Sequence, residues 1–176
     1  PLNITTATTQ AVFNNGTIIV KQKAGGTIIS DIQFNSNDND EYLILVDKTT
    51  NLTIENNTLA IENNIINDTH AIIVNDADDI KILNNTITTI GLSKNVNYDA
   101  NTRVYTSSIN AITTDNLVID SNTITTNYTG QSDIYGTIES IDIRGNSSNK
   151  QLQQNTMITN NKIYTQADKY AYGVVF

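Results

Sequence analysis

The chain has 176 residues, enough for one domain of ordinary size, with 38% hydrophobic and only 16% charged residues. Its 18 acidic residues against 10 basic ones give a formal charge of −8, and an acidic chain without a Lys/Arg cluster argues against nucleic-acid binding and against anionic membrane surfaces. No apolar run is long enough to cross a bilayer, and the absence of cysteine excludes a disulfide framework and thiolate metal sites.

Three residue types dominate the chain, which contains 27 Asn, 26 Thr and 27 Ile. Ile and Thr are β-branched and suit a pleated, half-buried surface, whereas Asn suits turns and tolerates left-handed backbone. Good helix formers are sparse, and no long window shows a 3.6-residue apolar period. The composition therefore predicts an all-β chain of many short strands joined by Asn-rich turns.

The expected elements begin with a segment whose role stays open, because residues 1–25 could form either a first turn or a cap. The stretch "TIISDIQFN" at 27–35 resembles the repeats that follow, with Ile32 at the position where they carry Asn. A second short apolar run, "YLILV" at 42–46, precedes the next repeat. Each unit of the chain is therefore expected to contain at least two strands.

One phrase then recurs four times in the chain. Its copies are "NLTIENNTL" from Asn51, "DIKILNNTI" from Asp79, "NLVIDSNTI" from Asn116 and "NTMITNNKI" from Asn155. Alignment of the copies places Asn57, Asn85, Asn122 and Asn161 in register, with spacings of 28, 37 and 39 residues. Such a period indicates a solenoid, a propeller or another array.

The unequal spacing distinguishes among these architectures. Propeller blades and leucine-rich repeats are nearly constant in length, whereas a coil with a minimum turn of about two dozen residues accepts insertions at its corners. Polar, aperiodic insertions are expected at 91–106, 127–137 and 145–155. Further apolar runs precede the later copies, at 71–74, 109–112 and 138–143, so each turn should carry two or three strands.

This pattern predicts a right-handed parallel β-helix of about five or six turns with corner insertions. Alternation within each phrase points its apolar residues to one side, so stacked turns should form columns of like side chains. The repeated Asn is expected to occupy the sharp turn and to form a hydrogen-bonded ladder from turn to turn. An unpaired buried amide costs roughly 1–3 kcal/mol, and a ladder pairs it. We therefore interpret the four aligned Asn residues as structural.

The two ends bear on domain organisation. The final residues, "AYGVVF" at 171–176, resemble the start of another turn, and an exposed apolar turn would promote aggregation. We therefore expect residues 1–176 to be a single β-helix domain cut from a longer surface protein.

The phrases of the form x-I-x-N-N-x-I resemble the parallel β-helix repeats of the pectin-lyase-like superfamily over residues 26–176. That superfamily contains lyases, hydrolases, phage tailspikes and non-catalytic surface proteins, so the resemblance implies a fold more than a function. The Asn, Thr and Ile bias, the repeated NNT and the absence of Cys also resemble the adhesin-like cell-surface proteins of methanogenic archaea. This second resemblance implies an extracellular, cell-surface module.

Candidate metal-ligating and catalytic residues are few. Asp76, Asp78 and Asp79 form the densest acidic cluster and would suit Ca²⁺, but turns favour Asp anyway, and "NDNDE" at 37–41 lacks the Gly and distal Glu of an EF-hand. We therefore expect no cofactor, with Ca²⁺ as the alternative.

A second set of candidate residues lies near the end of the apolar run at 138–143. Asp142 and Arg144 should share one side of a strand, as an ion pair or as an acid and base, whereas Glu139 and Asp142 should not share a face at strand spacing. His70, the only histidine, is expected to be a turn residue. The signature sequences of the hydrolase branch are not reproduced around these residues.

Aromatic residues in the expected insertions are the candidates for recognition, since sugar rings stack on aromatic faces. The binding candidates are Tyr98, Arg103, Tyr105, Tyr128 and Tyr135. The alternative is that each Tyr anchors its loop to the sheet. Two sequons within the insertions, at Asn127 and Asn146, are the expected glycosylation sites.

Three functions follow as expectations. The first is a non-catalytic adhesin-like module, a rigid scaffold that contacts glycan or protein on another cell. The second is a polysaccharide lyase or glycoside hydrolase that acts in a groove along one sheet. The third is a viral tailspike segment, which would form an obligate trimer.

Overall fold

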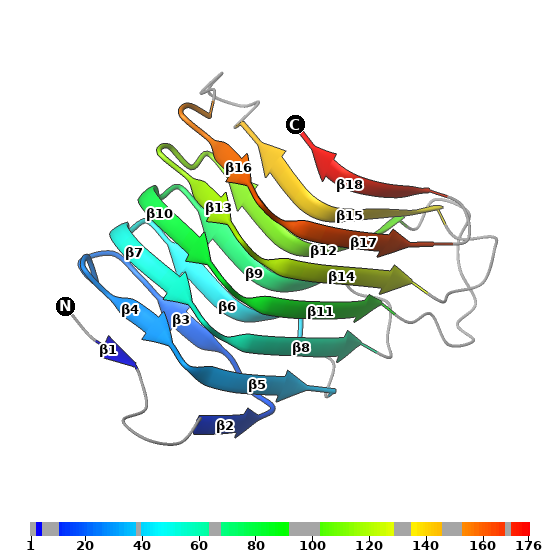
Figure 1. The fold of residues 1–176 in the computed structure, drawn as a ribbon, viewed down its shortest axis with the longest axis horizontal. Coiled ribbons are helices and arrows are strands. Elements are labelled where there is room, and N and C mark those ends of the chain that lie inside the picture. Colours follow the sequence, from blue (N-terminus) through cyan, green and yellow to red (C-terminus); the bar gives the residue numbers. More distant parts are fainter. Residues whose placement is uncertain are drawn as a thin grey trace.

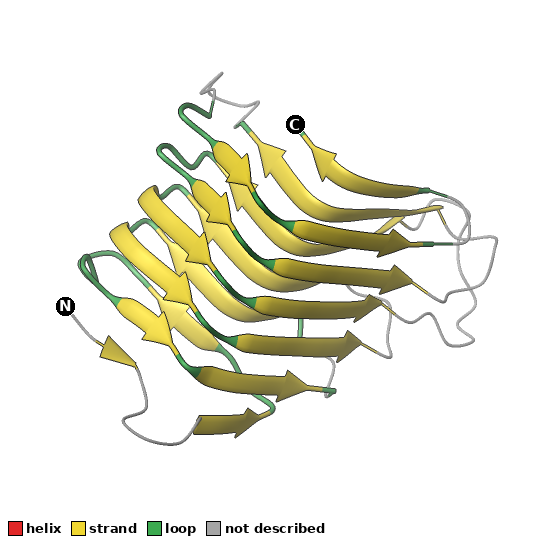
Figure 2. Ribbon diagram, viewed as in Figure 1, coloured by secondary structure: helices red, strands yellow, loops and turns green. Residues whose placement is uncertain are grey.

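The computed structural model describes residues 3–4, 11–37, 40–63, 68–91, 103–128, 135–145, 153–167 and 170–176. These residues form eighteen strands arranged in three parallel sheets of six, here called sheets A, B and C (Figures 1 and 2). Successive strands visit sheets A, B and C in turn, and each pairs with the equivalent strands of the neighbouring turns. The fold is therefore the expected right-handed parallel β-helix, with about six turns.

The strand bounds follow by sheet. Sheet A contains β1 (Asn3–Ile4), β4 (Ile28–Ser30), β7 (Thr50–Glu55), β10 (Asp78–Leu83), β13 (Val118–Asp120) and β16 (Met157–Thr159). Sheet B contains β2 (Ala11–Asn14), β5 (Ile32–Ser36), β8 (Thr58–Asn63), β11 (Thr86–Gly91), β14 (Thr123–Tyr128) and β17 (Lys162–Gln166). Sheet C contains β3 (Ile18–Val20), β6 (Tyr42–Asp47), β9 (Thr69–Asn75), β12 (Arg103–Ile112), β15 (Tyr135–Arg144) and β18 (Ala171–Val175).

The interior is built from columns of aliphatic side chains. In sheet A, Ile54 pairs with Ile82, which is level with Ile119 in the next turn, and none of the three side chains is exposed to solvent. Period-two alternation explains the columns, because every second residue of a strand faces the same side of its sheet. Burial of each such side chain contributes roughly 1.5–3 kcal/mol, which makes these columns the main source of stability.

The Asn column forms at the corner between sheets A and B. The Nδ2 group of Asn57 donates to Oδ1 of Asn85, Asn85 donates to Asn122, and Asn122 donates to Asn161, each over 3.0 Å. Each acceptor oxygen also receives the backbone N–H of the preceding ladder residue. At the first turn Ile32 replaces Asn, and its N–H donates to Oδ1 of Asn57 over 3.0 Å.

The left-handed backbone of this corner lies one residue earlier than the ladder. Positive φ angles near 55° occur at the preceding residues Asp31, Asn56, Asn84, Ser121 and Asn160. The sequence interpretation gave both tasks to one Asn, and the structure divides them between neighbours. The first residue turns the chain, and the second satisfies the exposed peptide groups of the adjacent turn.

A second polar column runs inside the helix between sheets B and C. Its hydroxyl groups hydrogen-bond in sequence over 2.7–2.9 Å, through Thr89, Ser108, Thr126, Ser140 and Thr165. A buried hydroxyl is tolerated only where it is paired, and here each turn supplies the partner of the next. The column therefore lets Ser and Thr replace aliphatic residues within the core.

The corner insertions are shorter than expected. β12 begins at Arg103, inside the expected insertion at 91–106, and β14 continues to Tyr128 before β15 begins at Tyr135. Part of these two expected insertions is therefore strand, because β12, β14 and β15 extend past the aliphatic runs that mark their cores. The third insertion, 145–155, lies largely outside the described residues.

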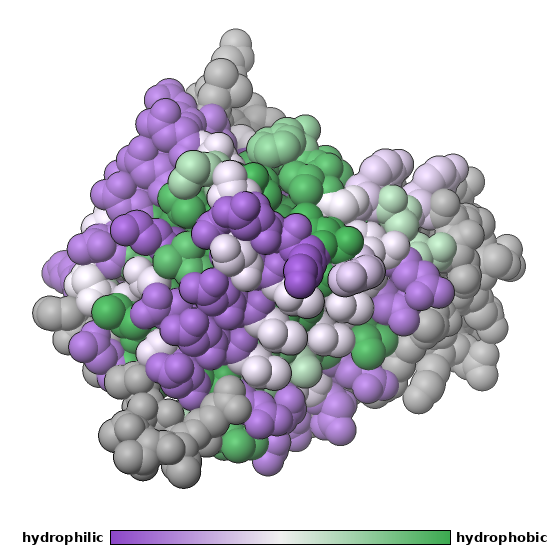
Figure 3. All heavy atoms as spheres, in the orientation of Figure 1, coloured by the Kyte–Doolittle hydropathy of each residue, from purple (hydrophilic) through white to green (hydrophobic). Residues whose placement is uncertain are grey.

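The last turn leaves apolar side chains open to solvent. Met157, Tyr164, Tyr172 and Phe176 are between 45% and 81% exposed. Figure 3 shows hydrophobic surface gathered over this end of the molecule, around β16, β17 and β18. No helix among the described residues is long and apolar enough to span a membrane.

Candidate functional site

The strands of sheet C bend midway along their length, as Figure 1 shows for β12 and β15. The strand pairing reflects this bend, because Ser107 pairs with Glu139 and the next registered pair is Ile109 with Ile141. Between them, the Ser140 hydroxyl bonds the inner hydroxyls of Thr126 and Thr165. Ile141 belongs to the core, so two consecutive side chains face inward at the bend.

This double inward step brings Glu139 and Asp142 to the same outer face. The expectation that these two carboxylates could not share a face is therefore wrong. It assumed uninterrupted alternation, which places residues three apart on opposite sides. The bend shifts the alternation by one residue, so positions three apart coincide.

The two carboxylates are held by one guanidinium group. Nε of Arg144 lies 2.7 Å from Oδ2 of Asp142, and Nη2 of Arg144 lies 3.2 Å from Oε2 of Glu139. The expected pairing of Asp142 with Arg144 is thus present, with Glu139 as a further partner. The Arg144 side chain is 45% exposed, whereas those of Glu139 and Asp142 are 8% and 3% exposed.

Arg144 also reaches back across the bend. Its Cζ lies 5.4 Å from the centroid of the Tyr105 ring, a cation–π contact. Tyr105 pairs with Thr137, two residues before Glu139, so the guanidinium group bridges both limbs of the bent strands. Arg144 therefore covers the carboxylates and forms the solvent-facing side of the cluster.

The electrostatics of this cluster follow from burial and proximity. Burial raises the pKa of Glu139, and the charge and hydrogen bond of Asp142 raise it further, while Arg144 opposes both effects. Burial lowers the pKa of Arg144, but Asp142 and Glu139 outweigh this and raise it above its usual range. Arg144 therefore remains a cation and cannot act as a base.

His70 lies beside this cluster, within strand β9 and not in a turn as expected. It is 6% exposed, and its Nδ1 atom lies 2.6 Å from Oγ of Ser107 on the neighbouring strand. Burial lowers the pKa of His70, although the negative charges of Asp68 and Asp142 act against this shift. Ser107 is only 2% exposed, so the pair forms a buried contact and presents no nucleophile to a polymer.

The tyrosine candidates do not form one cleft among the described residues. Tyr128 is 6% exposed and packs against Gly91, where a Cβ atom would lie 3.1 Å from Cδ2 of its ring. Tyr105 lies on β12 in the cation–π contact described above. Arg103 and Tyr135 pair at the starts of β12 and β15. The side chains of these two residues, and all of Tyr98, lie outside the described part of the chain.

The acidic turn serves local structure. Oδ1 of Asp78 accepts hydrogen bonds from the N–H of Asp79 over 2.9 Å and from Nδ2 of Asn116 over 2.8 Å. Asp76 and Asp79 both have positive φ angles, which fits a tight turn. Within the described ranges, no three His, Asp or Glu side chains gather closely enough to hold a metal ion, and this includes Asp76, Asp78 and Asp79.

The two expected glycosylation sites differ in placement. Asn127 lies in strand β14, half-buried, and its Oδ1 atom has no hydrogen-bond partner within the described part of the chain. Asn146 lies outside the described residues.

The convergence of His70, Ser107, Glu139 and Asp142 is the feature that sequence reasoning missed. A signal for it exists in the aligned strands, which read "THAII", "TSSIN" and "IESID". In each stretch the residue directly before Ile is small and faces inward, whereas strict alternation from an inward Ile would place that residue on the outer face.

Comparison of the chain with protein-family models, with curated proteins and with solved structures gives no match.

Proposed function

We propose that the chain is a non-catalytic, adhesin-like module of an extracellular surface, which holds or contacts glycan or protein on another cell. The observation that carries this proposal is that the charged side chains on sheet C pair with one another. The two carboxylates are almost fully buried, and Arg144 forms an ion pair with each of them. The polar groups best suited to chemistry thus act as a structural clamp.

The rest of the outer surface supports a scaffold role. Thr and Asn make up about half of the outward positions of sheet B, with Thr58, Thr86 and Thr123 in one row and Thr88 and Thr125 in the next. Two continuous hydrogen-bonded columns tie the turns together along the solenoid axis. Repetition of this kind gives length and stiffness, with a long surface for contact.

A polysaccharide lyase or glycoside hydrolase is the second candidate, favoured by the paired carboxylates. In retaining glycosidases the two carboxyl groups stand about 5–5.5 Å apart, and in inverting enzymes about 6.5–9.5 Å apart. Glu139 and Asp142 are both buried and contact the same Arg144 guanidinium group, so neither carboxylate is open to a sugar ring or an attacking water molecule. A lyase needs a free base, whereas Arg144 is engaged by both acids.

Two assays on the purified chain separate these candidates. The first measures release of reducing ends and unsaturated uronates from neutral and acidic polysaccharides, with and without Ca²⁺. The second measures attachment of beads coated with the chain to intact cells, with albumin-coated beads as control. We expect attachment without turnover.

The matched variant for the first assay is Asp142→Asn, which keeps the shape of the side chain and removes its charge. Turnover that Asp142→Asn abolishes would make the chain an enzyme and overturn the proposal. Absence of both turnover and attachment would also contradict it.

A further inference from the structure

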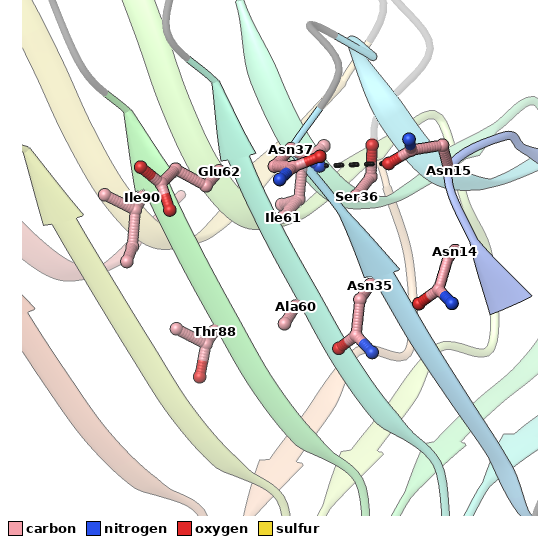
Figure 4. A pocket seen from close by; sticks show the side chains of 10 residues that line it. All are labelled: Asn14, Asn15, Asn35, Ser36, Asn37, Ala60, Ile61, Glu62, Thr88 and Ile90. Carbon is pink, nitrogen blue, oxygen red and sulfur yellow. Dashed lines mark hydrogen bonds between the residues drawn. The ribbon is translucent and has the colours of Figure 1, made fainter. Parts of the chain in front are cut away.

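The outer face of sheet B contains a pocket of about 340 Å³ near the first turns of the solenoid. Figure 4 shows the side chains of Asn14, Asn35, Ala60 and Thr88 in a row across its floor. These residues belong to adjacent strands and are in register, from Asn14 to Asn35, to Ala60 and to Thr88. The volume lies within the range of about 300–1,000 Å³ that is typical of small-molecule sites.

The pocket arises from one small residue within this row. Ala60 stands between Asn35 and Thr88, so its short side chain leaves a hollow between two longer polar ones. Strand alternation sends the neighbouring Phe34 inward, where it packs edge-on against Phe13 with ring centroids 5.5 Å apart. The aromatic pair beneath therefore supports the amide groups that face the pocket.

Hydrogen bonds fix the wall of the pocket at the ends of β2 and β5. The N–H of Asn37 donates to Oδ1 of Asn15 over 3.3 Å, as the dashed line in Figure 4 marks. Asp40 Oδ2 accepts from the Ser36 hydroxyl over 2.7 Å and from the N–H of Gly16 over 3.1 Å. The wall is thus formed before any ligand arrives, which reduces the entropy cost of binding.

The chemistry of the lining indicates the kind of ligand. Amide side chains offer both donors and acceptors, which suits adjacent hydroxyl groups, and Ala60 and Ile90 offer apolar surface for C–H groups. Glu62 is the one charged residue among those that line the pocket, so the site favours hydroxyl donors and disfavours anions.

The row continues beyond the pocket toward the other end of the solenoid. Thr88 pairs with Thr125, and Thr125 pairs with Tyr164, whose side chain is 63% exposed. Strands in a sheet repeat about every 4.8 Å, so the row presents evenly spaced polar groups that end at an open aromatic face. An extended polymer could follow this row, whereas a peptide strand would find no unpaired backbone on a sheet face.

From these observations we propose that the outer face of sheet B binds a neutral glycan, with one or two sugar residues in the Ala60 pocket. Asn14 and Asn35 contact its hydroxyl groups, and the chain of sugars runs along Thr88 and Thr125 toward Tyr164. This inference deepens the proposed contact with cell-surface glycan and rests on it for biological meaning. The binding itself can be tested separately.

The experiment is calorimetric titration of the 176-residue chain with the neutral probes cellotetraose, fully N-acetylated chitotetraose and mannotetraose, and with trigalacturonate as an acidic probe. Ala60→Phe fills the hollow, and Asn35→Ala removes one amide while leaving the strand intact. The matched control is Thr53→Phe, a similar enlargement on the outer face of sheet A. Far-ultraviolet circular dichroism and thermal melting establish that each variant is folded.

We expect at least one neutral tetrasaccharide to bind. Ala60→Phe should weaken its binding at least tenfold and Asn35→Ala at least fivefold, with Thr53→Phe unchanged. Binding that survives both pocket variants, binding of trigalacturonate alone, or no binding by any probe would overturn the inference. If Ala60→Phe does not affect bead attachment, the proposed function holds but does not depend on the pocket. If the pocket binds a glycan and the beads do not attach to cells, the binding site holds and the proposed function is wrong.

Discussion

Arg144 determines the character of the outer face of sheet C at the scale of single residues. It forms ion pairs with two buried carboxylates, contacts an aromatic ring across the bend and remains the exposed member of the cluster. Buried charges are tolerated only when paired, because desolvation penalises the charged form. The arrangement thus makes the burial of Glu139 and Asp142 conditional on one side chain.

Substitution of Arg144 by Met should reveal this dependence. Breaking a fully buried ion pair costs about 3–5 kcal/mol, and the partial exposure of Arg144 reduces this to about 1–3 kcal/mol of unfolding free energy. Urea denaturation at pH 7 measures the loss. The triple variant Arg144→Met, Glu139→Gln, Asp142→Asn should regain part of the lost unfolding free energy, because it leaves no buried charge without a partner. A triple variant no more stable than Arg144→Met would contradict the explanation.

The raised pKa of Glu139 predicts a distinct pH dependence. Its folded pKa lies above the ordinary value of 4.5, so its stabilising contribution is fully present below pH 4.5 and is lost as pH rises through the folded pKa. Glu139→Gln cannot ionise. The unfolding free energy of this variant, relative to the unaltered chain, should therefore increase as pH rises from 4.5 toward neutrality, in urea denaturation at a series of pH values.

His70 provides an internal control for that experiment, because its pKa is lowered whereas the pKa of Glu139 is raised. Its folded pKa lies below 6.5, so stability is lost as pH falls from about 6.5 through the folded pKa. His70→Asn should remove this loss and leave the effect of Glu139 unchanged. A Glu139→Gln profile parallel to that of the unaltered chain across the whole range would show that Glu139 has no shifted pKa.

At the scale of elements, the Asn column joins turns that are distant in sequence. An interior member such as Asn85 accepts two hydrogen bonds from Asn57 and donates to Asn122 and to the carbonyl of Ile54. Asn161, by contrast, is half-buried and has ladder contacts on one side only. The energetic weight of a ladder residue should therefore depend on its position.

Replacement of Asn85 by Ala should cost about 2–4 kcal/mol of unfolding free energy, because buried N–H groups of Asn57 lose their acceptor. Asn161→Ala should cost about 1 kcal/mol, since fewer groups are left unpaired and water can reach them. Chemical denaturation of both variants measures the difference. Equal losses would show that the contribution of a ladder residue to stability does not depend on its position in the column.

The sequence predicted much of the element arrangement, for a physical reason. Columns of Ile and a repeated Asn are one-dimensional signals, because neighbouring turns place equivalent residues side by side. The bend of sheet C left a weaker signal, since it depends on two consecutive inward residues such as Ser140 and Ile141. Alternation alone therefore separated Glu139 from Asp142, and the apolar run that marked the strand began only at residue 71, which left His70 in the expected turn. The pocket at Ala60 was not predictable either, because its depth depends on the lengths of neighbours from other turns.

At the scale of the whole molecule, each turn contacts only its neighbours, and the two ends lack one neighbour each. Interior strands such as β7, β10 and β11 are paired on both sides, whereas β16, β17 and β18 are paired on one. The last turn also leaves several apolar side chains exposed. Local stability should therefore fall from the middle turns toward both ends.

Hydrogen–deuterium exchange should show this gradient directly. We expect backbone amides of β7, β10 and β11 to exchange most slowly, and those of β2 and β16–β18 to exchange at least tenfold faster, because end strands open without disrupting the rest. Mass spectrometry after a time series of labelling gives the rates. Uniform protection along the chain would indicate that the solenoid unfolds only as a whole.

The corners of the solenoid differ in what they can accommodate, and this has a practical consequence. The corner between sheets A and B is held by the Asn column, whereas the connections from sheet B to sheet C vary in length from turn to turn. A foreign peptide grafted between β11 and β12 would replace a connection that is already long and leave the strand register intact. The same graft between β7 and β8 would interrupt the amide ladder. The solenoid could thus serve as a scaffold for peptide display, in which the corner between sheets B and C accepts inserted peptides and the corner between sheets A and B keeps the turns aligned.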